Sequence, residues 1–283
     1  MTDVYGILGH PVGHSRSPAM HNRAFAVLGI DAVYVPFSVA PERLETALRG
    51  VRALELRGVN VTLPHKSAII PLLDEIEADA RAIGAVNTVY RSGTKLCGTN
   101  SDAAGLTRAL AEASVPLTAA KVTVLGAGGA ARACVVGLAR AGAAQIAVAA
   151  RQESKARALT SELEMVLPQT ALSVCEWQEL PLTAALAESD LLVQATSATL
   201  GDGEGAEAFA RSLPLSALPA HASVVDIVYS PLDTSVLRLS RERGLRTIDG
   251  LGMLLHQAVI SFELWTGQVA PIDEMRTALS TSS

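Results

Sequence analysis

The stretch Lys121–Arg132, KVTVLGAGGAAR, decides how the second half of the chain folds. Its first five residues are mostly apolar and predict a short buried strand, and the Ala-rich residues Arg132–Ala141 predict a helix. Between them, Gly126, Gly128 and Ala131 match the pattern G-x-G-x-x-G/A. Glycines there allow a tight turn and a close approach to a pyrophosphate, which a helix N-terminus binds through its free N–H groups. The stretch therefore predicts a dinucleotide site.

This motif lies near the middle of the 283-residue chain, so the residues before it must form something else. A chain of this length exceeds the usual single core, and two domains are the default. We expect residues 1–102 to form a substrate-binding and catalytic domain and residues 103–249 to form a dinucleotide-binding domain. We expect residues 250–283 to pack back on the first domain.

In the second half, strands alternate with helices, which is typical of a doubly wound parallel sheet of the Rossmann type. Its strands are expected at Lys121–Leu125, Gln145–Ala149, Ser173–Cys175, Asp190–Ala195, Ser223–Ile227 and Arg246–Ile248. In the first half, α/β alternation followed by a hairpin predicts a mixed sheet covered by helices. Its strands are expected at Val4–Leu8, Ala32–Phe37, Gly58–Thr62, Asn87–Arg91 and Thr94–Cys97. Helices are expected from Ser17 (as N-cap) to Gly29 and over Pro41–Arg52, Lys66–Ile70, Leu73–Ala82, Asp102–Ala113 and Met253–Trp265.

The composition narrows the class of protein. Hydrophobic residues make up 49% and charged residues 18% of the chain, which indicates a packed globule rather than disorder. The net charge is −5 without a Lys/Arg cluster, so we expect no nucleic-acid partner. The sequence predicts neither a signal peptide nor a membrane span. Three scattered cysteines fit a reducing cytoplasm, and the six histidines lack metal-ligand spacing, so no metal is expected.

The residues after the second strand of the Rossmann-type half indicate the cofactor. In such folds an acidic residue there binds the 2′-hydroxyl of NAD, whereas an arginine accommodates the 2′-phosphate of NADP. Here Arg151 follows the strand, Lys155 lies one helical turn further, and Glu153 lies two residues beyond the strand tip. Two cations favour NADP, with NAD as the lesser option. The alternative is a solvated surface arginine.

Four polar clusters fall at expected loops in the first half. Buried polar atoms need partners, so these groups cannot all belong to a core. Ser, Thr and Asn side chains both donate and accept, which suits the hydroxyls of a sugar-like ring. The clusters are Gly13–Pro18 (GHSRSP), Asn60–Lys66 (NVTLPHK), Gly84–Thr88 (GAVNT) and Gly98–Asp102 (GTNSD).

These clusters carry a resemblance to a known family. The chain resembles the shikimate dehydrogenases, which read H-S-x-S-P, N-V-T-x-P-x-K, G-A-x-N-T, G-x-N-T-D, G-A-G-G-A and M-L-x-x-Q in this order. All occur here between His14 and Gln257, with Ser101 in place of Thr in the fourth motif. The resemblance covers nearly the whole chain. It implies reversible reduction of 3-dehydroshikimate to shikimate with NADPH, a step toward chorismate and the aromatic amino acids.

The resemblance also implies roles for single residues. Lys66 and Asp102 would be the catalytic pair, and Ser15 and Ser17 would hold the substrate carboxylate. The pocket for the ring hydroxyls would be completed by Thr62, Asn87, Tyr229 and Gln257. The pyrophosphate would be cradled by Gly126, Ala127, Gly128, Gly129 and Ala130, and the 2′-phosphate would meet Arg151 and Lys155. Further cofactor contacts would come from Thr196, Ser197, Ile227, Gly250 and Met253, the last two near the nicotinamide.

The chemistry requires these residue types. Hydride transfer to a ketone carbon creates an alkoxide, and an ammonium about 3 Å away can protonate it. A neighbouring carboxylate orients that ammonium and favours its charged form. Two of these residues also have purely structural interpretations. Asp102 could be the N-cap of the helix that follows it, and Gln257 could be a surface residue at a helix border.

Besides Ser101, four positions depart from the family pattern. Ala150-Arg151-Gln152 replaces N-R-T, and Gln194 and Thr199 stand where N-A-T-S-x-G has Asn and Gly. These changes bear on cofactor preference more than on fold. A paralogue acting on quinate or an amino-shikimate, with relaxed or NAD preference, is therefore the alternative function. A non-enzymatic ligand sensor is disfavoured because Lys66 and Asp102 are both kept. The expected partner is a small-molecule ring, and the chain is expected to be a monomer or homodimer.

Overall fold

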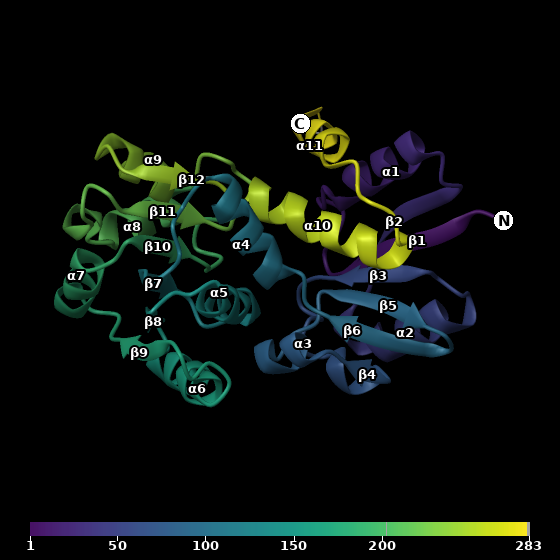
Figure 1. Cartoon of the computed structure of the whole chain (residues 1–283), viewed down its shortest axis with the longest axis horizontal. Coiled ribbons are helices and arrows are strands. Elements are labelled where there is room, and N and C mark those ends of the chain that lie inside the picture. The colour runs from purple at the N-terminus through teal and green to yellow at the C-terminus, as the bar shows by residue number, and fades with distance from the viewer. Residues whose placement is uncertain (202, 282–283) are drawn as a thin grey trace. The chain divides into compact units, whose positions relative to one another are not determined.

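A computed structural model describes residues 1–201 and 203–281 of the chain. The chain divides into two compact units, each with its own six-stranded sheet (Figure 1). Unit 1 comprises Met1–Gly105 and the segment from Leu255 onward, and unit 2 comprises Leu106–Leu254. Ser282 and Ser283, which end the segment expected to pack back, lie outside the described residues.

The sheet of unit 1 is mixed, with strand order β2-β1-β3-β5-β6-β4. β1 pairs in parallel with β2 and β3, whereas β5 runs antiparallel to β3 and β6, and the short β4 is parallel to β6. The β5–β6 hairpin turns at Gly93, whose φ of +61° suits glycine. The strands are β1 (Asp3–Gly9), β2 (Ala32–Ser38), β3 (Gly58–Val61), β4 (Glu75–Ile76), β5 (Thr88–Ser92) and β6 (Lys95–Thr99).

Helices from distant parts of the chain pack in unit 1. Trp265 lies so close to β3 that a Cβ at Gly58 would be 2.2 Å from its indole nitrogen. That nitrogen donates a hydrogen bond to Val89 O at 3.0 Å. Only glycine fits at that crossing. The helices are α1 (Ser17–Leu28), α2 (Leu44–Ala53), α3 (Ala78–Ile83) and α11 (Ile272–Thr281), together with parts of α4 (Asp102–Glu112) and α10 (Leu251–Thr266); two 3₁₀ turns are η1 (Pro41–Arg43) and η2 (Ile70–Leu72).

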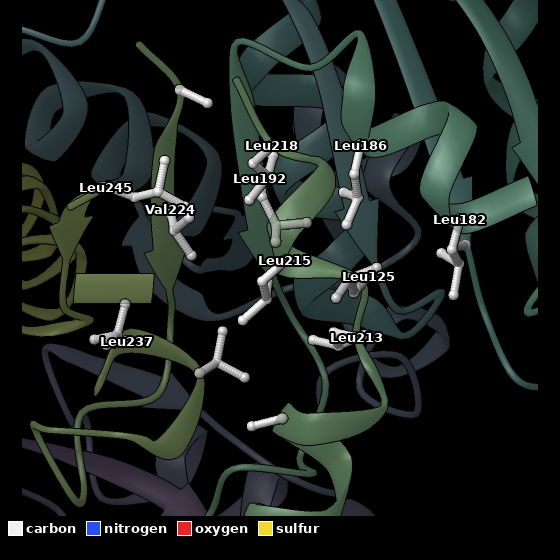
Figure 2. Packing of buried hydrophobic residues seen from close by; sticks show 14 of the residues in the cluster. Leu125, Leu182, Leu186, Leu192, Leu213, Leu215, Leu218, Val224, Leu237 and Leu245 are labelled. Carbon is white, nitrogen blue, oxygen red and sulfur yellow. The ribbon is translucent and has the colours of Figure 1, made fainter. Parts of the chain in front are cut away.

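The sheet of unit 2 is wholly parallel, with order β12-β11-β10-β7-β8-β9. The strand order reverses between β7 and β10, which makes their carboxyl ends a topological switch point. Leucines from strands and helices fill one core, including Leu125 on β7 and Leu192 on β10 (Figure 2). The strands are β7 (Lys121–Leu125), β8 (Gln145–Ala149), β9 (Ala171–Cys175), β10 (Leu191–Gln194), β11 (Ser223–Asp226) and β12 (Arg246–Ile248). The helices are α5 (Gly129–Arg140), α6 (Glu153–Glu164), α7 (Glu179–Ala187), α8 (Glu204–Ser212) and α9 (Ser235–Glu242), with a 3₁₀ turn η3 (Leu215–Ala217).

The predicted fold class is confirmed: a mixed α/β half and a doubly wound parallel half. The helix expected over Leu73–Ala82 is wrong in its first half. There Asp74 N–H donates to Leu96 O at 3.0 Å and Glu77 N–H donates to Gly98 O at 2.9 Å. The backbone of this segment therefore pairs with the edge of β6 instead of forming a helix. The helix expected over Lys66–Ile70 is also wrong, because that segment forms turns leading into η2.

Two expected caps also differ. Ser17 is the first residue of α1 rather than its N-cap, since Arg16 holds that place without a side-chain cap bond. Asp102 is likewise inside α4, and the carbonyl of Ser101 accepts from Gly105 N–H at 2.8 Å. Asp102 is therefore not the N-cap, and its carboxylate is available for other contacts. No helix in residues 1–201 and 203–281 has both the length and the apolar character needed to cross a bilayer.

An unusual feature of the unit 1 core is a fully buried histidine. The ring of His21 stacks on Tyr34 with centroids 4.4 Å apart, and neither ring nitrogen has a hydrogen-bond partner among the described residues. Burial lowers the pKa of His21 to about 3. In the unfolded chain the same imidazole binds a proton near pH 6.5. The contribution of the neutral, buried His21 to the free energy of unfolding is therefore complete above that pH. It is lost as the pH falls from about 6.5 toward 3, a total of roughly 4–5 kcal/mol.

We predict that His21→Leu makes unit 1 less sensitive to acid. At pH 7.5 the free energy of unfolding should change little, because an unpartnered buried ring is exchanged for an apolar side chain. Between pH 6 and pH 4 the variant should lose less stability than the parent, as measured by urea denaturation at each pH. His14→Leu, at an exposed position, is the control. Equal acid sensitivity in the parent and in His21→Leu would contradict the assignment.

Candidate functional site

Two oppositely charged side chains meet in unit 1. Lys66 lies in the turn after β3, Asp102 begins α4, and Lys66 Nζ is 2.6 Å from Asp102 Oδ2. The side chains are 20% and 9% exposed, so the pair is largely shielded from water. Backbone bonds hold both residues: Val86 N–H donates to Lys66 O at 2.8 Å, and Asp102 N–H donates to Asn100 Oδ1 at 3.0 Å. The result is an ammonium with one donor used by the carboxylate and others left to serve a ligand.

Asn87 orients the carboxylate from its other side. Its Nδ2 donates to Asp102 Oδ1 at 2.8 Å and to Ser101 Oγ at 2.9 Å. Its Oδ1 accepts from the backbone N–H of Ser101 at 2.8 Å. Because a backbone N–H can only donate, this bond settles which end of the amide is oxygen. Both oxygens of Asp102 are therefore held, one by an amide and one by an ammonium.

A buried polar network continues behind Asn87. Thr88 Oγ1 lies 2.9 Å from both Asn87 Oδ1 and Ser261 Oγ. Asn60 Nδ2 donates to Ser261 Oγ at 3.0 Å and to Thr88 Oγ1 at 3.2 Å, and Tyr34 donates its hydroxyl to Asn60 Oδ1 at 2.8 Å. These residues come from β2, β3, β5 and α10, so the network joins four elements of unit 1.

The network also reaches the predicted carboxylate-binding serines. Burial raises the pKa of Tyr34 well above its ordinary value, and a side-chain hydrogen bond with Ser17 opposes that rise. Ser17 is buried, and its backbone N–H donates to Ser15 Oγ at 3.3 Å. At the other end, Ser261 donates to Gln257 O at 3.0 Å. Continuous contacts therefore run from Ser15 and Ser17 to the lysine–aspartate pair.

Sequence reasoning missed part of this network. Asn60 and Thr88 lie inside quoted motifs, and their position beside Thr62 and Asn87 could have marked them. Tyr34 and Ser261 carry no local signal, because one lies on a strand and the other on an apolar helix face. Of the residues predicted for the ring, all but one belong to unit 1: Ser15, Ser17, Thr62, Lys66, Asn87, Asp102 and Gln257, while Tyr229 lies in unit 2.

In unit 2, the glycine motif forms the predicted strand–turn–helix. Gly126 has a φ of +117°, and a Cβ there would lie 2.9 Å from Ala195 O. Gly128 is the N-cap of α5, is exposed and has open space where a Cβ would be. The turn therefore presents the first N–H groups of α5 to an anion, which is the geometry a pyrophosphate requires.

The two predicted phosphate-binding cations lie beyond β8. Arg151 and Lys155 are exposed, and within the described part of the chain neither forms an ion pair. Glu153, between them, pairs instead with Arg157 one turn along α6. The carboxylate that would favour a ribose hydroxyl is thus engaged, and both cations remain available.

The remaining predicted cofactor contacts follow the ends of three adjacent strands. Thr196 and Ser197 follow β10, Ile227 follows β11, and Gly250 and Met253 follow β12. A Cβ at Gly250 would lie 2.4 Å from Ile227 O, so the two loops are in close contact. Ligands of parallel α/β sheets bind at this edge.

Family models match most of the chain. Their descriptions are the shikimate dehydrogenase substrate binding domain for residues 7–89, shikimate / quinate 5-dehydrogenase for residues 109–201, and the shikimate 5'-dehydrogenase C-terminal domain for residues 250–279. The shikimate dehydrogenase (NADP(+)) of Symbiobacterium thermophilum is 44% identical over 278 residues, covering 97% of this chain and 92% of that protein. The chain belongs to the shikimate dehydrogenase family.

Solved structures agree with this membership. Shikimate 5-dehydrogenase from Thermus thermophilus, in complex with NADP(H) and shikimate, has a TM-score of 0.86 and 37% identity and covers 99% of each chain. Quinate dehydrogenase from Corynebacterium glutamicum, in complex with NAD, has a TM-score of 0.89 and 30% identity and also covers 99% of each chain. The predicted family is confirmed. As a member, the chain is an NAD(P)-dependent oxidoreductase that acts on a CH–OH group.

We predict that Thr88→Val destabilises unit 1. Valine has nearly the same shape but lacks the hydroxyl that meets Asn60 and Asn87, so buried polar atoms lose partners at a cost of about 1–3 kcal/mol. Urea denaturation measures the change. Thr88→Ser keeps the hydroxyl and is the matched control. If the valine variant proves as stable as the serine variant, the network does not depend on this hydroxyl.

Proposed function

We propose that this chain interconverts 3-dehydroshikimate and shikimate with NADP(H), using Lys66 and Asp102 for proton transfer. The observation that carries the proposal is the shielded contact of 2.6 Å between Lys66 Nζ and Asp102 Oδ2. An ion pair that only stabilises the fold would not need N–H groups left over for a ligand. The Lys66 ammonium has such N–H groups, and it lies among residues whose side chains can bind hydroxyls.

In the direction of reduction, bound NADPH supplies a hydride to the ketone carbon. Lys66 donates a proton to the oxygen as it gains negative charge, which completes the alcohol. Asp102 keeps the ammonium aimed at that oxygen, and Asn87 keeps the carboxylate from turning. In the direction of oxidation, neutral Lys66 accepts the hydroxyl proton as the hydride leaves the same carbon.

We assign substrate binding to unit 1 and cofactor binding to unit 2. Ser15 and Ser17 bind the ring carboxylate, and the ring hydroxyls meet side chains that both donate and accept. Those side chains are Thr62, Asn87, Gln257 and, from unit 2, Tyr229. The cofactor pyrophosphate binds at Gly126–Ala130, and further cofactor contacts come from Thr196, Ser197, Ile227, Gly250 and Met253.

NADP is preferred over NAD in this proposal because of charge. Arg151 offers a fork of donors that matches a phosphate, and Lys155 adds a second cation one turn away. Both lack ion-pair partners within the described residues. Gln152 supplies an amide where the family pattern has a threonine hydroxyl. Binding of the 2′-phosphate therefore depends mainly on Arg151 and Lys155.

We predict that Lys66→Met lowers kcat by about 10²- to 10⁴-fold, because proton transfer loses its general acid and base. The Kd for shikimate, measured by calorimetry, should change far less. Lys95→Met is the control, since Lys95 is an exposed lysine paired with Glu75 on the same unit. Near-parental turnover in Lys66→Met on every ring tested would remove Lys66 from the proton-transfer step.

We predict that Arg151→Ala weakens NADPH binding by roughly 10- to 100-fold, because charge-assisted bonds to the 2′-phosphate are lost. NADH binding should stay the same, since NADH lacks that phosphate. Fluorescence titration with both cofactors measures this. Arg241→Ala, an exposed arginine of unit 2 that pairs with Asp233, is the control. An equal loss for NADH and NADPH would contradict the phosphate role.

The second candidate is quinate oxidation with NAD, favoured by the similarity to quinate dehydrogenase. Steady-state kinetics with shikimate and quinate, each with NADP and NAD, separate the two functions. We expect the highest kcat/KM for shikimate with NADP. A higher value for quinate with NAD would select the alternative.

A further inference from the structure

A fully buried carboxylate in unit 2 takes no part in the mechanism above. Asp226 ends β11 and is 0% exposed, and no cation pairs with it in the part of the chain that the structure describes. Its Oδ1 accepts from Val228 N–H at 3.0 Å and from Gln194 Nε2 at 3.4 Å, and its Oδ2 accepts from the Thr234 hydroxyl at 2.7 Å. The Thr199 side chain is a further hydrogen-bond partner.

This arrangement has an electrostatic cost. Burial raises the pKa of Asp226, while the surrounding hydrogen bonds oppose the rise. Every partner donates, which an ionised carboxylate with four acceptor sites can use and a protonated one cannot. The donors come from three different segments, so the carboxylate ties these segments together.

The first segment is the loop after β10, which is organised by Gln194. Gln194 Oε1 accepts from Thr196 N–H at 2.7 Å. Its Nε2 donates to Thr199 Oγ1 at 2.8 Å and to Thr196 O at 3.1 Å. One side chain therefore holds both ends of the loop Thr196–Thr199. Gln194 and Thr199 are both 0% exposed, so water cannot replace either partner.

The other segments follow β11. Val228 N–H bonds to Asp226, and Val228 O accepts from Gly250 N–H at 3.3 Å, which brings in the loop after β12. Ile227 N–H donates to Gln194 O at 3.1 Å. Thr234, besides donating to Asp226, caps α9 by accepting from Leu237 N–H.

We infer that Asp226, Gln194 and Thr199 form one positioning unit that sets the loops at the carboxyl ends of β10, β11 and β12 for cofactor binding. This inference rests on the proposed cofactor role of Thr196, Ser197, Ile227 and Gly250. Gln194 and Thr199 act as a matched pair, because each satisfies a buried polar group of the other. They are also the two positions at which this chain departs from the Asn and Gly of the family pattern, and they contact each other directly.

Three variants test the pairing: Gln194→Asn, Thr199→Gly and the double variant. Asparagine is one methylene shorter and loses reach to the loop, and Thr199→Gly leaves Gln194 and Asp226 each short of a partner. We expect each single change to raise the Kd for NADPH roughly tenfold. We expect the double variant to lose less than the two single losses combined, because the Gln194–Thr199 bond that either change removes is lost only once. Calorimetric Kd values for shikimate should stay unchanged in all three.

Thr170→Gly is the matched control. Thr170 is a buried threonine of unit 2 whose hydroxyl donates to Ala143 O, and it precedes β9 at the opposite edge of the sheet. It should lower the melting temperature without changing the Kd for NADPH. If the Gln194 and Thr199 variants behave the same way as this control, the contacts only stabilise the fold and the inference is wrong. Additive losses in the double variant would also overturn it.

Amide hydrogen exchange of residues 195–201 in the cofactor-free protein separates this inference from the proposed function. We expect faster exchange in each single variant, and in the double variant an increase smaller than the two single increases combined, whether or not NADPH binds. Failure of the parent to bind NADPH would contradict the proposed function, while the exchange pattern would still decide the pairing. Unchanged exchange in the single variants would overturn the positioning role.

Discussion

A carboxylate held between an ammonium and an amide is the contact on which the catalytic account depends. Asp102 uses one oxygen for Lys66 and the other for Asn87, so neither charged group can turn freely. Shielding from water strengthens this attraction. An ammonium placed in this way can give and take back a proton without large rearrangement.

The rest of unit 1 serves that contact by defining the orientation of Asn87. The backbone N–H of Ser101 requires an oxygen opposite it, and the chain Thr88, Asn60 and Tyr34 supports the same orientation from behind. In unit 2, the buried carboxylate of Asp226 performs a comparable task for backbone loops. In both units, polar groups that water cannot reach define one geometry, because any other arrangement would leave them without partners.

Local patterns in the sequence predicted the strands of both sheets except the short β4, which lies where a helix was expected. Every strand of unit 2 was expected from the regular alternation of strands and helices, and Gly126 and Gly128 marked the first turn. The helix predicted over Leu73–Ala82 was wrong in its first half because local periodicity carries no information about pairing with β6. Lys66 and Asp102 could be named from motifs, whereas Tyr34 and Ser261 could not, because a hydrogen bond between a strand and a distant helix leaves no local trace. The contact between Gln194 and Thr199 likewise appears only once the loop is folded.

The most direct measurement is a crystal structure of the chain with shikimate and NADP⁺ bound. The account predicts that Lys66 Nζ and a carboxylate oxygen of Asp102 both lie about 3 Å from one ring hydroxyl, the one on the carbon that faces the nicotinamide. A complex in which that hydroxyl meets other side chains, with Lys66 directed away from the ring, would contradict it.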